Sequence, residues 1–265
     1  MKKISTILIL AILLFNMGCS KFEKLLKSDD ADLKYSQAMI YYANKDFFKA
    51  GTLFDNVSEL YRGTLRSDTL AYYNAMCKYN QSDYELAAFL FKQHANLYPR
   101  SGYAESSSYM HAYCYYQQSP IASLDQSNTY RAIEAFRAFI RKYPDASNVQ
   151  LAKDLINELR DKLVEKSYIS ARLYFDLEEY KASIIALNNS LVDYPDTKHR
   201  EEILYLILKS NYLLARNSIQ SKQNERYQNT IDAYYSFIEE YPQSKYTDES
   251  QKILKDSEKS IKHQN

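Results

Sequence analysis

A motif that recurs every thirty-seven residues constrains the fold of this chain more than any other feature. Three large side chains, mostly tyrosine, stand at the same spacing in three successive copies. The copies are Tyr35, Met39 and Tyr42, then Tyr72, Met76 and Tyr79, then Tyr109, Tyr113 and Tyr116. Intervals of four and three residues bring side chains onto one face of an α-helix, so each copy predicts a helix with an aromatic stripe. A fixed period of this length predicts a repeat protein.

A second motif follows each of these helices and predicts a partner helix. A small residue is followed by a large one after four residues and by another side chain after seven. In four of five copies a Tyr-Pro pair comes next, and proline cannot continue a helix without losing a hydrogen bond. The copies are Ala50, Phe54 and Val57; Ala87, Phe91 and His94; Ala132, Phe136 and Phe139; Ser183, Leu187 and Ser190; and Thr230, Tyr234 and Phe237. Five helix pairs are therefore expected.

The two motifs together resemble the tetratricopeptide repeat. This resemblance implies an all-α, right-handed α-solenoid of about five helix pairs with a C-terminal capping helix, which we place at residues 245–262. In the repeat family the first helix of each pair lines the inner surface, so the three tyrosine-rich trios are implied to face bound protein segments. Tyrosine suits such contacts because it combines a large apolar body with a polar tip. The alternative is that many of these rings only pack against the next repeat.

The fourth unit departs from the standard repeat length. Its first helix is expected to start near Ser147 or Asn148, which are good N-caps, and to run to about Asp176. It carries Tyr168 and Arg172 at positions matching the earlier trios, and we include both as candidates for partner binding. The third and fifth units are expected to carry polar insertions at residues 119–128 and 218–224.

The N-terminus has the layout of a secretory signal peptide. Lys2 and Lys3 precede an apolar run, and Gly18 stands directly before Cys19. The small residue before a cysteine resembles a lipobox, although Asn16 replaces the leucine that is usual there. We expect a signal peptide at residues 1–18, lipid attachment at Cys19 and a tether over residues 19–30. An ordinary cleaved signal with a free cysteine is the alternative.

Composition argues against several other classes of function. The 34 basic and 33 acidic side chains leave a net charge of +1, so no nucleic-acid partner is expected. The four histidines show no metal-ligand spacing, and glycine-rich phosphate loops are absent from the sequence. Cys77 and Cys114 occupy equivalent repeat positions and are predicted to be small buried side chains. We expect no enzyme activity, no metal, no cofactor and no small-molecule substrate.

The anchor, the five repeats and the elongated later units together resemble the BamD family, lipoproteins of the β-barrel assembly machinery. The resemblance implies a lipid-anchored scaffold on the periplasmic face of the outer membrane. Repeats one to three, residues 31–144, would capture unfolded outer-membrane proteins. Residues 145–262, with repeats four and five and the capping helix, would dock the periplasmic domains of BamA. The alternative is another repeat lipoprotein of the envelope, serving pilus or secretin assembly or cell division.

Overall fold

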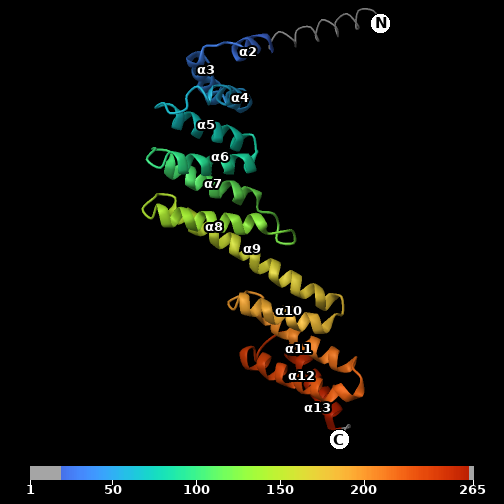
Figure 1. Ribbon diagram of the computed structural model, residues 1–265. Helices are drawn as coiled ribbons and strands as arrows, with labels where there is room; N and C mark the ends of the chain where they lie inside the picture. Colours follow the sequence, from blue (N-terminus) through green and yellow to red (C-terminus); the bar gives the residue numbers. More distant parts are fainter. Residues whose placement is uncertain (1–18, 263–265) are drawn as a thin grey trace, which may run out of the picture. The chain divides into compact units, whose positions relative to one another are not determined.

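The computed structural model describes residues 19–262, which form twelve α-helices and no strand (Figure 1). The helices are α2 (Cys19–Leu26), α3 (Ala31–Ala43), α4 (Phe47–Val57), α5 (Ser67–Asn80), α6 (Tyr84–Leu97), α7 (Ala104–Gln118), α8 (Ser127–Lys142), α9 (Val149–Asp176), α10 (Tyr180–Asp193), α11 (Arg200–Arg216), α12 (Gln220–Glu240) and α13 (Thr247–Lys262). The helices from α3 to α12 form the five predicted pairs, and α13 is the predicted capping helix. The chain is an α-solenoid of helix pairs, as the sequence predicts.

The helices divide into two compact units. The first contains the described residues up to Pro120 together with Ser127–Leu159, and the second contains Ile121–Gln126 and the chain from Arg160 onward. Within the first unit each helix from α3 to α8 packs against the next, and within the second unit α10 to α13 do the same. Neighbours in sequence are therefore neighbours in space, as expected where each repeat buries its apolar face against the next.

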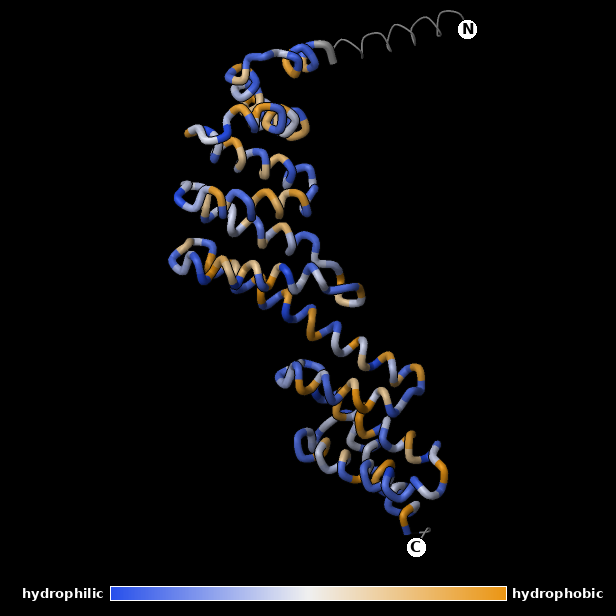
Figure 2. The backbone as a smooth tube through the Cα atoms, in the orientation of Figure 1, coloured by the Kyte–Doolittle hydropathy of each residue, from blue (hydrophilic) through white to orange (hydrophobic). Residues whose placement is uncertain are grey.

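The core includes the positions of the second motif and the recurring alanines of the first helices. Small residues allow the helices to approach closely, and the large residues one turn later fill the space between them. The alanines of the first helices and the motif residues of the second helices are buried, among them Ala38, Ala75, Ala112, Ala50, Phe54, Val57, Ala87, Phe91, His94, Ala132, Phe136, Phe139, Ser183, Leu187, Ser190, Thr230, Tyr234 and Phe237. Figure 2 shows the apolar residues spread along all the helices and interleaved with polar ones. The repeat motif is thus a core motif.

The helix ends follow from local chemistry. Tyr98, Tyr194 and Tyr241 are C-caps, and the proline after each restricts its backbone to non-helical conformations. At the other end, the carboxylates of Asp30, Asp46 and Asp83 accept hydrogen bonds from the backbone of the first turn of α3, α4 and α6.

The predicted long helix is confirmed, because α9 has 28 residues. The expected loop of the third unit is also present, between the end of α7 and the start of α8. Most of the polar insertion expected at residues 218–224 is helical, since α12 begins at Gln220. Its glutamine and lysine residues have good helix propensity, so the segment lengthens the helix.

Helix α2 is a feature that the sequence analysis did not anticipate. Residues 19–26, inside the segment assigned to a tether, are helical, and Phe22, Leu25 and Leu26 pack against the core of the first repeat. The rings of Phe22 and Tyr41 meet edge to face with centroids 5.8 Å apart. The predicted signal peptide at residues 1–18 lies outside the described residues. Between residues 19 and 262 no helix combines the length and apolar character needed to cross a bilayer.

Candidate partner-binding surface

The first trio lies half-buried on α3, beside the helix end that lacks the Tyr-Pro pair. The Tyr35 ring packs against Phe54 and Tyr61, with centroid separations of 6.2 and 5.5 Å. Met39 lies against the same apolar cluster. The Tyr42 ring contacts Tyr73 of the next repeat at 4.8 Å, so the trio already links two repeats.

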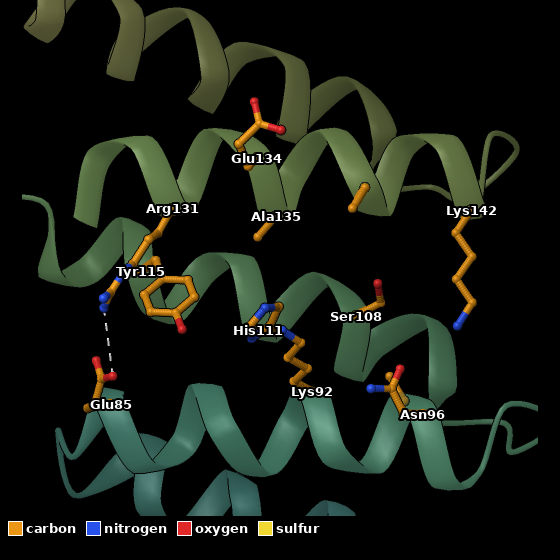
Figure 3. A pocket seen from close by; sticks show the side chains of 12 residues that line it. Glu85, Lys92, Asn96, Ser108, His111, Tyr115, Arg131, Glu134, Ala135 and Lys142 are labelled. Carbon is orange, nitrogen blue, oxygen red and sulfur yellow. Dashed lines mark ion pairs between the residues drawn. The ribbon is translucent and has the colours of Figure 1, made fainter. Parts of the chain in front are cut away.

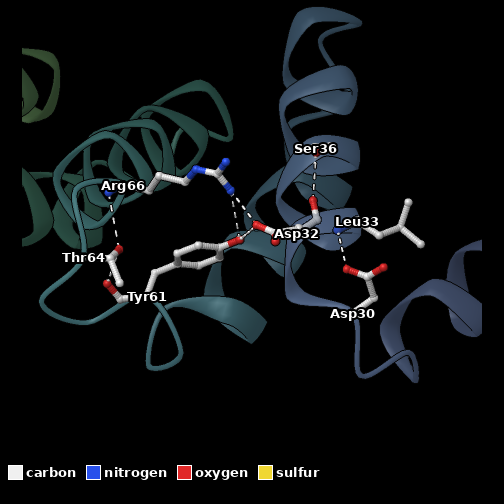
Figure 4. A network of polar contacts seen from close by, with 7 residues as sticks. All are labelled: Asp30, Asp32, Leu33, Ser36, Tyr61, Thr64 and Arg66. Carbon is white, nitrogen blue, oxygen red and sulfur yellow. Dashed lines mark hydrogen bonds and ion pairs between the residues drawn. The ribbon is translucent and has the colours of Figure 1, made fainter.

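A polar network connects Asp32 at the start of α3 with Tyr61 and Arg66 (Figure 4). The Tyr61 hydroxyl donates to Asp32 Oδ1 over 2.6 Å, and the Arg66 guanidinium donates to the same oxygen over 2.5 Å. The guanidinium carbon of Arg66 also lies 5.4 Å from the Tyr35 ring centroid, within cation–π range. The hydrogen bond from Tyr61, together with Arg66, lowers the pKa of Asp32. The network contacts the first trio at Tyr35, through the Tyr61 ring and the Arg66 guanidinium.

The second trio lies on α5 and is also half-buried. Tyr72 stacks on Tyr103 with ring centroids 4.4 Å apart, and its hydroxyl lies 3.0 Å from Ser106 Oγ. Met76 packs against the apolar cluster of the second repeat. The Tyr79 ring lies 6.3 Å from the Tyr113 ring, which belongs to the third trio. The second trio therefore bridges to α7.

The third trio, on α7, combines one buried ring with two half-buried rings. Tyr109 is only 8% exposed and packs edge to face on Phe139 at 5.5 Å. Tyr113 is half-buried between Tyr109 and Tyr116, stacked on both. The Tyr116 hydroxyl donates to the carboxylate of Glu158 over 3.0 Å. One trio therefore contributes both a core ring and rings that reach the surface.

These nine side chains, seven tyrosines and two methionines, together form what we call the tyrosine ladder: Tyr35, Met39, Tyr42, Tyr72, Met76, Tyr79, Tyr109, Tyr113 and Tyr116. Contacts between its members and neighbouring tyrosines connect the first three repeats. Burial raises the pKa of both Tyr42 and Tyr109 to about 12, so these phenols stay neutral at physiological pH. Neutral hydroxyls can donate hydrogen bonds to peptide carbonyls, and half-buried rings keep part of their surface accessible. The ladder therefore links the first three repeats through ring contacts.

In the second unit, Tyr168 and Arg172 form part of another network. Tyr168 is buried, and its ring stacks on His199 with centroids 4.0 Å apart. The Arg172 guanidinium donates to the Tyr168 hydroxyl over 3.0 Å and to Glu202 over 3.2 Å. The pKa of Tyr168 is raised to about 12, mainly by burial and secondly by a hydrogen bond with Glu202. Arg172 is the exposed member of the pair, so it is the one available to a partner.

The same arrangement recurs one repeat later, and the sequence analysis missed it. Tyr205 and Lys209 lie thirty-seven residues after Tyr168 and Arg172. The Tyr205 ring stacks on Tyr246 at 3.9 Å, and Lys209 Nζ donates to the Tyr205 hydroxyl over 3.1 Å and pairs with Glu249. Extending the thirty-seven-residue interval by one more step would have found both residues.

The cysteines of the second and third repeats are core residues. Cys77 and Cys114 are free and fully buried, as predicted, and burial raises the pKa of each thiol to about 12. Gly51 of α4 lies against Cys77, since a Cβ at this glycine would stand 3.3 Å from the Cys77 Cβ. Within residues 19–262 no three His, Cys, Asp or Glu side chains cluster in a way that could hold a metal ion.

Comparison with known proteins gives the family. The solved TPR2AB-domain:pHSP90 complex of yeast Sti1 is similar at 14% identity, over 86% of this chain and 98% of that chain, with a TM-score of 0.39. A likeness this distant carries no argument here. No curated protein matches the sequence. The family model YfiO, described as an outer membrane lipoprotein, matches residues 27–227, well over half of the chain. The chain therefore belongs to the YfiO, or BamD, family of outer-membrane lipoproteins.

Proposed function

We propose that this protein is a non-enzymatic scaffold of the β-barrel assembly machinery, anchored through lipid on Cys19 to the periplasmic face of the outer membrane. Family membership supports the outer-membrane lipoprotein assignment. The solenoid supports a role in protein binding, since stacked repeats build extended binding surfaces. In this proposal its partners are the periplasmic domains of BamA and unfolded outer-membrane proteins.

The tyrosine ladder is the observation that carries the proposed cargo role. Strand segments of outer-membrane proteins alternate apolar and polar residues and end in aromatic belts. Half-buried rings such as Tyr72 and Tyr113 can accept such apolar side chains at low entropic cost, because neighbouring rings already restrict them. The first three repeats, residues 31–144, are therefore the proposed cargo-binding half.

The second half, residues 145–262, is the proposed docking site for BamA. Arg172 supports this assignment because its guanidinium is exposed and oriented by Tyr168 and Glu202. An arginine held in position by its neighbours is a frequent anchor at protein interfaces.

Affinity capture from detergent-solubilised membranes tests the docking half of the proposal. The tagged protein should recover BamA, and Arg172→Ala should reduce that recovery about tenfold, the effect of losing one interface anchor of moderate strength. Lys181→Ala, which alters an exposed lysine of α10, is the matched control and should recover BamA normally. Recovery of secretin or pilus components in place of BamA would instead support the alternative envelope role.

A further inference from the structure

A hollow between α6 and α8 lies on a different face of α7 from the tyrosine ladder. It has a volume of about 620 Å³, within the range of about 300–1,000 Å³ that is usual for ligand sites. Ser108, His111 and Tyr115 of α7 line it, whereas the ladder uses Tyr109, Tyr113 and Tyr116. Figure 3 shows side chains of α6 and α8 facing one another across this hollow, with those of α7 between them.

Small side chains create the space. Ala95 of α6 and Ala135 and Ala138 of α8 line the hollow beside Ser108. Long charged side chains stand around them, so an occupant would meet an apolar floor and a charged rim. That combination suits a peptide segment with mixed apolar and charged side chains.

The cations of the rim are incompletely paired. Arg131 lies 3.9 Å from Glu85, a long separation for an ion pair between two largely exposed groups. Glu134, the second acidic side chain that lines the hollow, forms an ion pair over 2.8 Å with Arg137, which does not line it. Lys92 and Lys142 form no ion pair with any side chain of the described residues; Lys142 Nζ lies 5.2 Å from the Tyr143 ring centroid.

His111 does not compensate for these cations. Its Nδ1 lies 2.9 Å from the carbonyl oxygen of Ala88, so this nitrogen carries a proton and donates it to the carbonyl. Burial, together with the nearby Lys92, lowers the pKa of His111. The end of the hollow with Lys92, Asn96, Ser108 and Lys142 thus offers donors and positive charge with no facing acid (Figure 3).

The preceding repeat contains an equivalent hollow of about 270 Å³ with a different charge. Asp55 of α4 takes the position that Lys92 has in α6, and Leu97 takes that of Lys142. The Asp55 carboxylate is already satisfied, because Asn74 Nδ2 donates to it over 2.6 Å and Lys78 Nζ over 2.8 Å. Repeat geometry therefore produces the hollow, while the unpaired positive charge is particular to the α6–α8 copy.

We propose that the hollow lined by α6, α7 and α8 binds an acidic segment of a partner protein. Side-chain carboxylates would pair with Lys92, Lys142 and Arg131 while apolar side chains rest on the alanines. Three cations at separate points of the rim match successive acidic side chains better than a single terminal carboxylate. The proposal is independent of the identity of the cargo and of BamA docking.

Fluorescence anisotropy with short synthetic peptides tests this proposal on the purified protein. The probe is a labelled peptide that alternates glutamate with leucine and has blocked ends. It should bind, and its affinity should fall as salt is added. A peptide with lysine in place of glutamate should not bind. A third peptide, with serine in place of glutamate and a free C-terminal carboxylate, should also fail, because side chains are the proposed ligands.

Charge variants assign the binding to the hollow. The double variant Lys92→Glu and Lys142→Glu should weaken binding of the acidic peptide by about tenfold or more. The control pair Lys153→Glu and Lys181→Glu makes the same change in net charge at exposed lysines elsewhere and should bind normally. If the double variant does not fold by circular dichroism, Lys92→Gln with Lys142→Gln replaces it. Failure of the acidic peptide to bind, or equal loss in both pairs, would overturn the proposal.

Discussion

At the residue scale, the same repeat position holds a buried tyrosine in one repeat and a half-buried tyrosine in another. The thirty-seven-residue spacing predicts which rings share a helix face, but it does not predict how deeply each ring is buried. Tyr109 is a core residue because it packs against both Phe136 and Phe139. The first repeat has Val57 at the position of Phe139, and Tyr35 stays half-buried. Burial depends on the partners across the helix pair, which single-sequence periodicity does not specify.

This difference predicts a graded response to truncation within the third trio. Tyr109→Ala should lower the free energy of unfolding by about 3 kcal/mol or more, since it removes a buried aromatic ring. Tyr113→Ala should cost clearly less because its ring is only half-buried. Urea denaturation followed by circular dichroism measures both. Equal losses for the two variants would contradict the burial that distinguishes them.

The Glu165 network predicts a pH-dependent contribution to stability. Glu165 Oε2 lies 2.8 Å from His199 Nε2 and 3.2 Å from Lys198 Nζ. The hydrogen bond with His199 is the main reason why the pKa of Glu165 lies below its usual 4.5. A lowered carboxylate pKa adds stability above the unfolded-state value, and this is lost as pH falls through the folded-state value.

Glu165→Gln should therefore destabilise the protein at pH 7 by up to about 1 kcal/mol, as is usual for partly exposed ion pairs. The difference from wild type should shrink as the pH falls below 4.5. Thermal melts over this pH range provide the measurement. Glu225→Gln, at an exposed position of α12, is the control and should show no such trend. A constant difference at all pH values would rule out the electrostatic explanation.

At the element scale, local signals specify most boundaries. The Tyr-Pro pairs end α6, α8, α10 and α12, and the length of α9 follows from its uninterrupted pattern. Helix α2 could not be anticipated because it has only eight residues, too few to be stable alone. It is held by the packing of Phe22, Leu25 and Leu26 against the first repeat, which lies in other elements.

Helix α3 provides a direct test of capping. Asp30 Oδ1 accepts a hydrogen bond from the Leu33 amide over 2.8 Å. Asp30→Ala should lower stability by about 1 kcal/mol, whereas Asp30→Asn should retain nearly all of it because asparagine caps equally well. Chemical denaturation of the two variants separates the cap from the charge. If asparagine is as harmful as alanine, the negative charge matters and the cap does not.

At the scale of the whole molecule, the period predicts the order in which helices stack, because each pair must cover the apolar face of its neighbour. It does not predict the surface chemistry of each repeat. The α6–α8 hollow is basic and the α4–α6 hollow contains a satisfied aspartate, although both arise from the same geometry. Such differences lie at positions that the core motif leaves unspecified, and they are where partner specificity can arise.

Photo-crosslinking in intact cells tests the central claim most directly, namely that the tyrosine ladder is a binding surface. A benzophenone amino acid at Tyr113 should crosslink to newly exported outer-membrane proteins, identified by mass spectrometry. The same probe at Lys153, an exposed position on α9, should not. Capture of outer-membrane proteins from Tyr113 alone is the predicted result. Capture of none from Tyr113, or equal capture from both positions, would contradict a cargo-binding role for the ladder.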